Sequence, residues 1–207
     1  MNNYISVGCD ALVTLQFHRQ RNDSYFANRL LNKLIYFKYG TIDTFLKECR
    51  NLTENVQVDY FLFRIKNENF DLIYLKKLEL DGKLIELPHL ESIVVLNIPF
   101  WGGGCEPWAS KNRDDIPQPS INDGLLEVFG VYSSFHIAQL QVGLAEPFRI
   151  GQAKQVKIKL SKRFPVQIDG EPFEQNPATI CITKFNQVIM LENKQQHHHN
   201  DSNSTTD

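Results

Sequence analysis

Apolar residues in the early part of the chain recur at the spacing of a helix. After Ser24 they follow one another every three or four positions until Gly40, at Phe26, Leu30, Leu31, Leu34, Ile35 and Phe37. This spacing places them on one face of an α-helix. Ser24 is a suitable N-cap, Gly40 a C-terminal stop, and Thr41 the cap of a second short helix through Arg50. The pattern predicts two consecutive helices.

The rest of the chain consists mostly of short β-branched and apolar runs separated by Gly, Pro, Asn and Asp. Strands are predicted at Ile93–Ile98, Leu125–Tyr132, Val156–Leu160, Pro165–Ile168, Ala178–Thr183 and Gln187–Leu191. Residues 4–15 form a further run that contains Gly8 and Asp10, as a strand passing into a tight turn or a helix start does. Residues 133–144 predict one more short helix. Short strands between turns favour an antiparallel sandwich over a doubly wound sheet.

Two segments depart from this pattern. Residues 59–77, DYFLFRIKNENFDLIYLKK, are rich in Phe, Tyr, Ile and Asn and are compatible with a β-hairpin that turns at residues 67–69. The tail from residue 193 is polar without apolar periodicity and is predicted to be disordered, its three histidines being either solvated or a weak metal-binding tract. We therefore predict one domain over residues 1–192, mainly β with a few helices (α+β).

Charge and cysteine content narrow the function classes. Lys and Arg number 22 against 24 Asp and Glu, a net charge of −2, so the chain lacks the basic field of a nucleic-acid-binding protein. No window approaches the roughly 18 apolar residues of a spanning helix, and no basic leader begins the chain, so we expect a cytoplasmic protein. The four cysteines are far apart, which argues against a zinc site or a disulfide framework.

Three segments place acidic residues or glycines at the end of an apolar run: NIPFWGGGCEPW (97–108), INDGLLEV (121–128) and VQIDGEPF (166–173). A carboxylate pair such as Asp123 and Glu127 can bind a divalent ion or accept a hydroxyl proton during phosphoryl transfer. Asp-Gly is equally a strong hairpin-turn sequence, and this alternative applies to residues 123–124 and to 169–171.

The glycine run and Asp10 also have two interpretations. Gly102, Gly103 and Gly104 suit a loop that a bulky ligand approaches, or a structural turn between anchors at Trp101 and Trp108. Asp10 is placed either to face a ligand hydroxyl or to cap the turn that follows it.

Taken in order, several motifs together resemble the C-terminal, accessory half of the diacylglycerol kinase catalytic region. They are VGCDA (7–11), KLIYFKYGT (33–41), LDGKLIELP (80–88), VLNIPFWGGG (95–104), DGLLEV (123–128), SFHIAQLQVGLAEPFRIGQ (134–152) and PVQIDGEPF (165–173). The resemblance implies a lipid kinase that moves the γ-phosphate of ATP to diacylglycerol with Mg²⁺. In that family an α/β half with a Gly-Gly-Asp-Gly-Thr nucleotide loop faces a β-sandwich accessory half.

The resemblance also implies roles for individual residues. Asp123 would be the general base or a magnesium ligand beside the acceptor hydroxyl, with Glu127 as its partner. The nucleotide side would be Asp169, Gly170 and Glu171, with Glu171 near the ribose or adenine, and Arg29 and Lys33 near the phosphates or else on an exposed helix face. The lipid side would comprise Asp10, Trp101, Gly102, Gly103 and Gly104.

The chain departs from the family pattern in three places. It contains no Gly-Gly-Asp-Gly-Thr loop, so a nucleotide-binding half must come from elsewhere in a longer protein or from a partner. Residues 59–77 interrupt the pattern, either as a hairpin or as translated non-coding sequence. Phe100 stands where the family usually has a small polar residue.

The alternatives to a peripherally membrane-associated diacylglycerol kinase half are two. One is a non-catalytic module that docks on a membrane or partner through the loops around Trp101 and Trp108, assisted by the basic run at 154–163. The other is half of a sphingosine or ceramide kinase.

Overall fold

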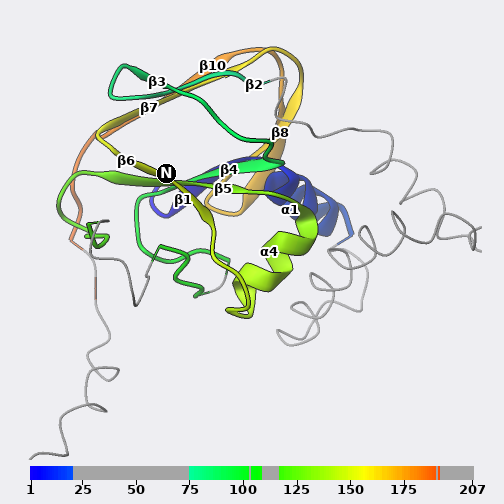
Figure 1. Ribbon diagram of the computed structural model, residues 1–207, viewed down its shortest axis with the longest axis horizontal. Coiled ribbons are helices and arrows are strands. Elements are labelled where there is room, and N and C mark those ends of the chain that lie inside the picture. Colours follow the sequence, from blue (N-terminus) through cyan, green and yellow to red (C-terminus); the bar gives the residue numbers. More distant parts are fainter. Residues whose placement is uncertain (21–74, 103, 109–116, 190, 192–207) are drawn as a thin grey trace, which may run out of the picture.

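The computed structural model describes residues 1–20, 75–102, 104–108, 117–189 and 191. Within them the strands form a six-stranded sheet and a four-stranded sheet, and every strand pair is antiparallel. Figure 1 shows the four-stranded sheet over one face of the larger sheet and the helices α1 (Cys9–Gln20) and α4 (Ser134–Gln141) under the other. The predicted α+β antiparallel sandwich is confirmed.

The strands are not arranged in chain order. The larger sheet runs β6 (Phe148–Ala153), β5 (Leu126–Val131), β4 (Ser92–Leu96), β1 (Tyr4–Gly8), β8 (Phe164–Ile168), β9 (Glu171–Gln175). The smaller sheet runs β10 (Thr179–Thr183), β7 (Gln155–Leu160), β2 (Leu75–Leu80), β3 (Lys83–Ile85). The N-terminal strand β1 thus lies inside the larger sheet.

Most strand predictions agree with the structure. Those at 93–98, 125–132, 156–160, 165–168 and 178–183 correspond to β4, β5, β7, β8 and β10, and the helix at 133–144 to α4. The strand at 187–191 is wrong, because the described residues of that run pair with no strand and Val188 and Ile189 are exposed. The predicted helices at 24–50 lie outside the described residues, as does the hairpin at 59–77 except for residues 75–77, which begin β2.

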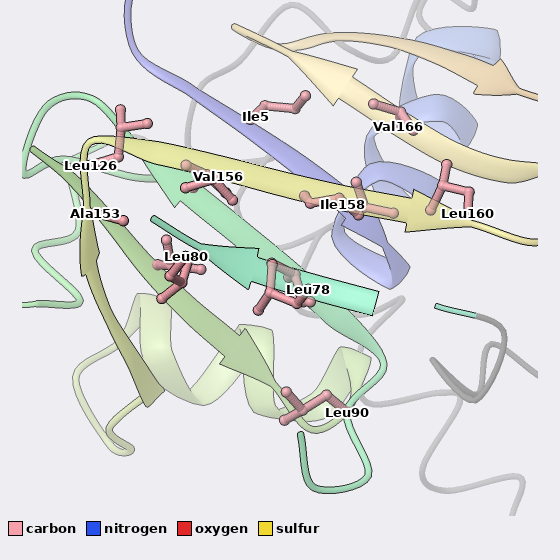
Figure 2. Packing of buried hydrophobic residues seen from close by; sticks show 14 of the residues in the cluster. Ile5, Leu78, Leu80, Leu90, Leu126, Ala153, Val156, Ile158, Leu160 and Val166 are labelled. Atoms are coloured by element: carbon pink, nitrogen blue, oxygen red, sulfur yellow. The ribbon is translucent and has the colours of Figure 1, made fainter. Parts of the chain in front are cut away.

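The main core fills the space between the two sheets. Alternate residues of most strands point into it, so that Ile5 and Val7 of β1 lie in one cluster with Val156 and Ile158 of β7. Figure 2 shows Ile5, Val156 and Ile158, with Leu78 and Leu80 of β2 in the same cluster. Burying each aliphatic side chain contributes roughly 1.5–3 kcal/mol, so this layer is the main source of stability.

The opposite face of the larger sheet carries a second cluster beneath the helices. It contains Cys9, Val94, Leu96, Trp101, Trp108, Phe129, Val131, Ile137 and Leu140. Three polar side chains, Ser6, Glu127 and Gln167, alternate with residues of the main core and therefore lie on this helix-covered face, where all are buried. Buried polar groups need internal partners, so this face is where chemistry or positioning is to be sought.

Gly8 joins β1 to α1 and has to be glycine. Its φ is 109°, and a Cβ there would lie 2.2 Å from the backbone oxygen of Glu91. Gly82, in the turn between β2 and β3, also has a positive φ, 81°, but its Cβ would meet nothing within 4 Å.

We expect Gly8→Ala to lower the free energy of unfolding by about 3–5 kcal/mol, because backbone strain and a steric overlap add. The matched variant Gly82→Ala carries the strain alone and should cost about 1–2 kcal/mol. Urea denaturation of both variants measures the difference. Equal losses would contradict the close approach of Gly8 to Glu91.

Candidate functional site

The sheet register brings the three predicted segments to one end of the larger sheet. Glu127 pairs with Leu96, and Leu96 pairs with Tyr4. The backbone N–H of Asp169 donates to the oxygen of Tyr4 at 2.9 Å, and Ile168 pairs with Glu171. We call this the acidic end of the sheet, defined by Asp123, Glu127, Asp169 and Glu171. The glycine loop follows β4 at the same end.

The acidic end has two separate parts. Neighbouring strands lie about 4.8 Å apart, and β4, β1 and β8 stand between β5 and β9. Glu127 and Glu171 are therefore about 19 Å apart across the sheet. No single atom of a ligand can meet both carboxylates, whereas an extended ligand can span them.

Asp123 and Glu127 form the first part. Asp123 is exposed, and its Oδ1 accepts the N–H of Leu125 at 2.8 Å. Glu127 is 1% exposed, and its Oε1 accepts from Nε2 of Gln152 at 3.2 Å. Burial raises the pKa of Glu127, and the negative charge of Asp123 raises it further. Asp123 is thus the carboxylate a ligand can reach, with Glu127 behind it.

The second part is a tight hairpin turn. Asp169 and Gly170 have φ values of 51° and 90° and connect β8 to β9, so the hairpin interpretation of this sequence is confirmed. The carboxylate of Asp169 accepts the backbone N–H groups of Asn2 and Asn3 at 2.7 Å and of Tyr4 at 3.1 Å. Asp169 therefore anchors the segment that leads into β1, while Glu171 is exposed.

A third Asp-Gly sequence also forms a turn. Asp81 and Gly82 have φ values of 49° and 81°, and the Asp81 carboxylate accepts the N–H of Gln155 at 2.8 Å. This turn belongs to the smaller sheet. The same sequence thus builds the turn of Asp169 and Gly170 again in the smaller sheet, with its carboxylate likewise bonded to backbone N–H groups.

The glycine run forms a closed loop. The backbones of Trp101 and Cys105 bond to each other at 2.8 and 2.9 Å, and Gly102 and Gly104 have φ values of 56° and 106°. Gly103 lies outside the described residues. These positive φ values explain the glycines as a turn.

Both tryptophans are anchors and offer no docking surface in the described structure. Trp101 is 1% exposed and Trp108 3%, so neither indole presents the lipid-facing surface expected from the sequence. The exposed aromatic residue beside the loop is Phe100, which is 45% exposed.

Asp10 is buried on the helix-covered face. Its Oδ2 accepts the hydroxyl of Ser6 at 2.5 Å and Nε2 of Gln167 at 3.4 Å. Burial raises the pKa of Asp10, while Ser6, Gln167 and the nearby indole of Trp101 act in the opposite direction. With 4% exposure, Asp10 is enclosed by protein atoms. The sequence analysis missed Ser6 and Gln167, although each is a polar residue inside an apolar run.

Three basic residues are candidate partners for the phosphates. Arg29 and Lys33 lie outside the described residues. Lys184, which the sequence analysis also missed, packs over the turn of Asp123 because its Nζ would lie 3.6 Å from a Cβ at Gly124. No sequence pattern marks Lys184, since it follows the edge strand β10 without a motif.

The described part of the chain includes no group of three His, Cys, Asp or Glu side chains placed to hold a metal ion. None of its helices is long and apolar enough to cross a membrane.

We predict that Asp10→Ala lowers the free energy of unfolding by about 2–4 kcal/mol, because Ser6 and Gln167 lose a buried acceptor. Asp10→Asn keeps that acceptor and should cost less than about 1 kcal/mol. The fold raises the pKa above 3.8, so the wild type loses stability as the pH rises through the folded pKa, and Asp10→Asn does not. Denaturation at several pH values measures this. An Asp10→Asn variant as unstable as Asp10→Ala would refute it.

The comparisons with known proteins agree with this architecture. The family model described as the diacylglycerol kinase accessory domain matches residues 1–172. Diacylglycerol kinase 2 of Arabidopsis thaliana is 38% identical over 92% of this chain and 25% of its own length. Diacylglycerol kinase 1 of Drosophila melanogaster is 34% identical over 92% of the chain and 17% of its own length.

Diacylglycerol kinase theta of Mus musculus is 34% identical over 88% of the chain and 18% of its own length. The chain thus spans a quarter or less of the length of these relatives. The family match covers all of the acidic end, both helices and the buried cluster around Asp10. The chain belongs to the diacylglycerol kinase accessory domain family.

Proposed function

We propose that the enzyme to which this domain contributes transfers the γ-phosphate of ATP to the hydroxyl of diacylglycerol, giving phosphatidic acid. The observation that carries the proposal is the acidic end, where the register gathers carboxylates from two separate sequence segments beside the glycine loop of a third. The names of the relatives support the substrate class. The sequence contains no Gly-Gly-Asp-Gly-Thr loop, so a further domain would supply the nucleotide loop.

In this proposal the first part of the acidic end receives the lipid hydroxyl. Phosphoryl transfer depends mainly on positioning and on neutralising the charge of the transferred group. Asp123 is exposed and would accept the hydroxyl proton, while the buried Glu127 would hold β5 and its turn in place through Gln152. Lys184 would supply positive charge beside Asp123 for the transferred phosphate.

The carboxylates of the first part also suit magnesium. Mg²⁺ commonly binds one or two protein carboxylates and takes its remaining ligands from phosphate and water. Asp123, with a second acid close enough to feel its charge, fits that pattern. When bound, the ion would neutralise the phosphates during transfer.

The second part would meet the nucleotide. Glu171 is exposed at a rigid turn and would contact the ribose or adenine, with Gly170 allowing close approach. Asp169 would fix that turn, since its carboxylate is bonded to the backbone before β1. Arg29 and Lys33 would lie near the phosphates. The separation of the two parts suits an extended ligand such as ATP.

Diacylglycerol is a membrane lipid, so the enzyme would bind the membrane surface peripherally. Lys157 and Lys159 on β7 would assist, each cation being worth about 1 kcal/mol near an anionic leaflet.

The test is a chimera in which this chain replaces the accessory domain of Diacylglycerol kinase 2 of Arabidopsis thaliana. Asp123→Asn should lower kcat about 10²–10⁴-fold if the carboxylate accepts the proton. Asp81→Asn, the same change in another Asp-Gly pair, whose carboxylate accepts the backbone N–H groups of Lys154 and Gln155, should leave kcat within about twofold. Phosphate transfer from radiolabelled ATP, with the products separated by chromatography, measures both variants.

Two results would overturn the proposal. Unchanged activity in Asp123→Asn would favour a docking module without catalytic residues. A labelled sphingosine or ceramide phosphate in place of phosphatidic acid would favour the related lipid kinases.

A further inference from the structure

Gln167 links the turn that carries Glu171 to the buried carboxylate of Asp10. Its Oε1 accepts the backbone N–H of Gly170 at 2.7 Å, inside the turn that carries Glu171. Its Nε2 donates to Oδ2 of Asp10 at 3.4 Å. The side chain is 0% exposed, so its hydrogen bonds within the protein are the ones that hold it.

Only a glutamine fits both contacts. The turn requires an acceptor, and the carboxylate requires a donor, and an amide supplies one of each in a fixed geometry. A leucine would leave the Gly170 N–H and one side of Asp10 unsatisfied. A reversed amide would set its oxygen against the carboxylate. The orientation of the Gln167 amide is therefore fixed by the carboxylate of Asp10 at one end and the backbone N–H of Gly170 at the other.

Asp10 is itself held rigidly. It lies in the first turn of α1, whose start is tied to the sheet by the bond from Cys9 N to Glu91 O at 2.9 Å. Ser6, on the neighbouring strand β1, donates to the same oxygen as Gln167 does. The resulting path leads from α1 through Asp10 and Gln167 to the exposed turn.

We infer that Gln167, oriented by Asp10, is a positioning residue that holds the Asp169–Glu171 turn in the geometry required for nucleotide binding. This inference rests on the proposed function, because it takes Glu171 as the nucleotide contact. It assigns to the buried Asp10 a role in ATP affinity, and none in contacting lipid.

The test uses the same chimera and measures KM for magnesium-ATP, KM for diacylglycerol and kcat. Gln167→Leu should raise the KM for ATP about tenfold, the cost of a lost hydrogen bond at the turn, with the other two constants within about twofold. Gln175→Leu is the matched control, since Gln175 lies at the far end of the same hairpin, opposite Phe164. It should change none of the three constants.

Variants of Asp10 provide a second route if Gln167→Leu does not fold. Asp10→Asn keeps an acceptor for Gln167 and should retain the wild-type KM for ATP, whereas Asp10→Leu should raise it as Gln167→Leu does. The double variant Asp10→Leu with Gln167→Leu should be no worse than either single change, because both interrupt one path.

Four outcomes would count against these claims. An active chimera whose KM for ATP is unchanged by Gln167→Leu would overturn the positioning role alone. A loss of kcat equal to the loss of ATP affinity, or an equal effect of Gln175→Leu, would overturn it as well. A wild-type chimera without activity would instead overturn the proposed function.

Discussion

The pairing of β1 with both β4 and β8 is the constraint on which the rest of the structure depends. This N-terminal strand lies between the two halves of the larger sheet and hydrogen-bonds to strands about 85 and 160 residues later in the chain. Without it, β6, β5 and β4 would not be joined to β8 and β9. Its register also sets Asp169 against Tyr4 and directs α1 under the sheet, so one pairing places both parts of the acidic end.

The two faces of this sheet have different tasks. The face toward the smaller sheet is apolar and supplies stability. The helix-covered face includes two buried carboxylates, Asp10 and Glu127, whose pKa values burial raises. Burying a carboxylate costs free energy unless hydrogen bonds offset it, and Ser6, Gln167 and Gln152 provide them here. We infer that these buried polar groups are retained because they fix the geometry of the acidic end.

Local features of the fold were predictable and distant ones were not. Alternating apolar runs identified β4, β5, β7, β8 and β10, and the Asp-Gly of residues 169–170 indicated a hairpin. The described residues of the run at 187–191 are similarly apolar but pair with no strand, and composition alone cannot reveal that. The order of strands, and hence the meeting of residues 121–127 with 169–171 at one end, depends on long-range pairing that no short motif encodes.

The candidate site was predictable to a similar degree. The motifs identified Asp123 and Glu171, which are exposed at the acidic end. They did not distinguish these residues from Asp169, whose carboxylate is bonded to the backbone, or from Trp101, which is buried. Gln167 escaped notice because a single glutamine in an apolar strand has no motif, and its importance comes from the neighbours that folding gives it.

In the proposed function, ligands meet the domain at the acidic end. Hydrogen exchange measured by mass spectrometry on the active chimera, with and without magnesium-ATP and a short-chain diacylglycerol, tests it most directly. We expect slower exchange in peptides that cover residues 120–127 and 168–172, and unchanged exchange in residues 161–163 at the opposite end of the sheet. Protection confined to residues 161–163, or to the outer face of the smaller sheet, would contradict it.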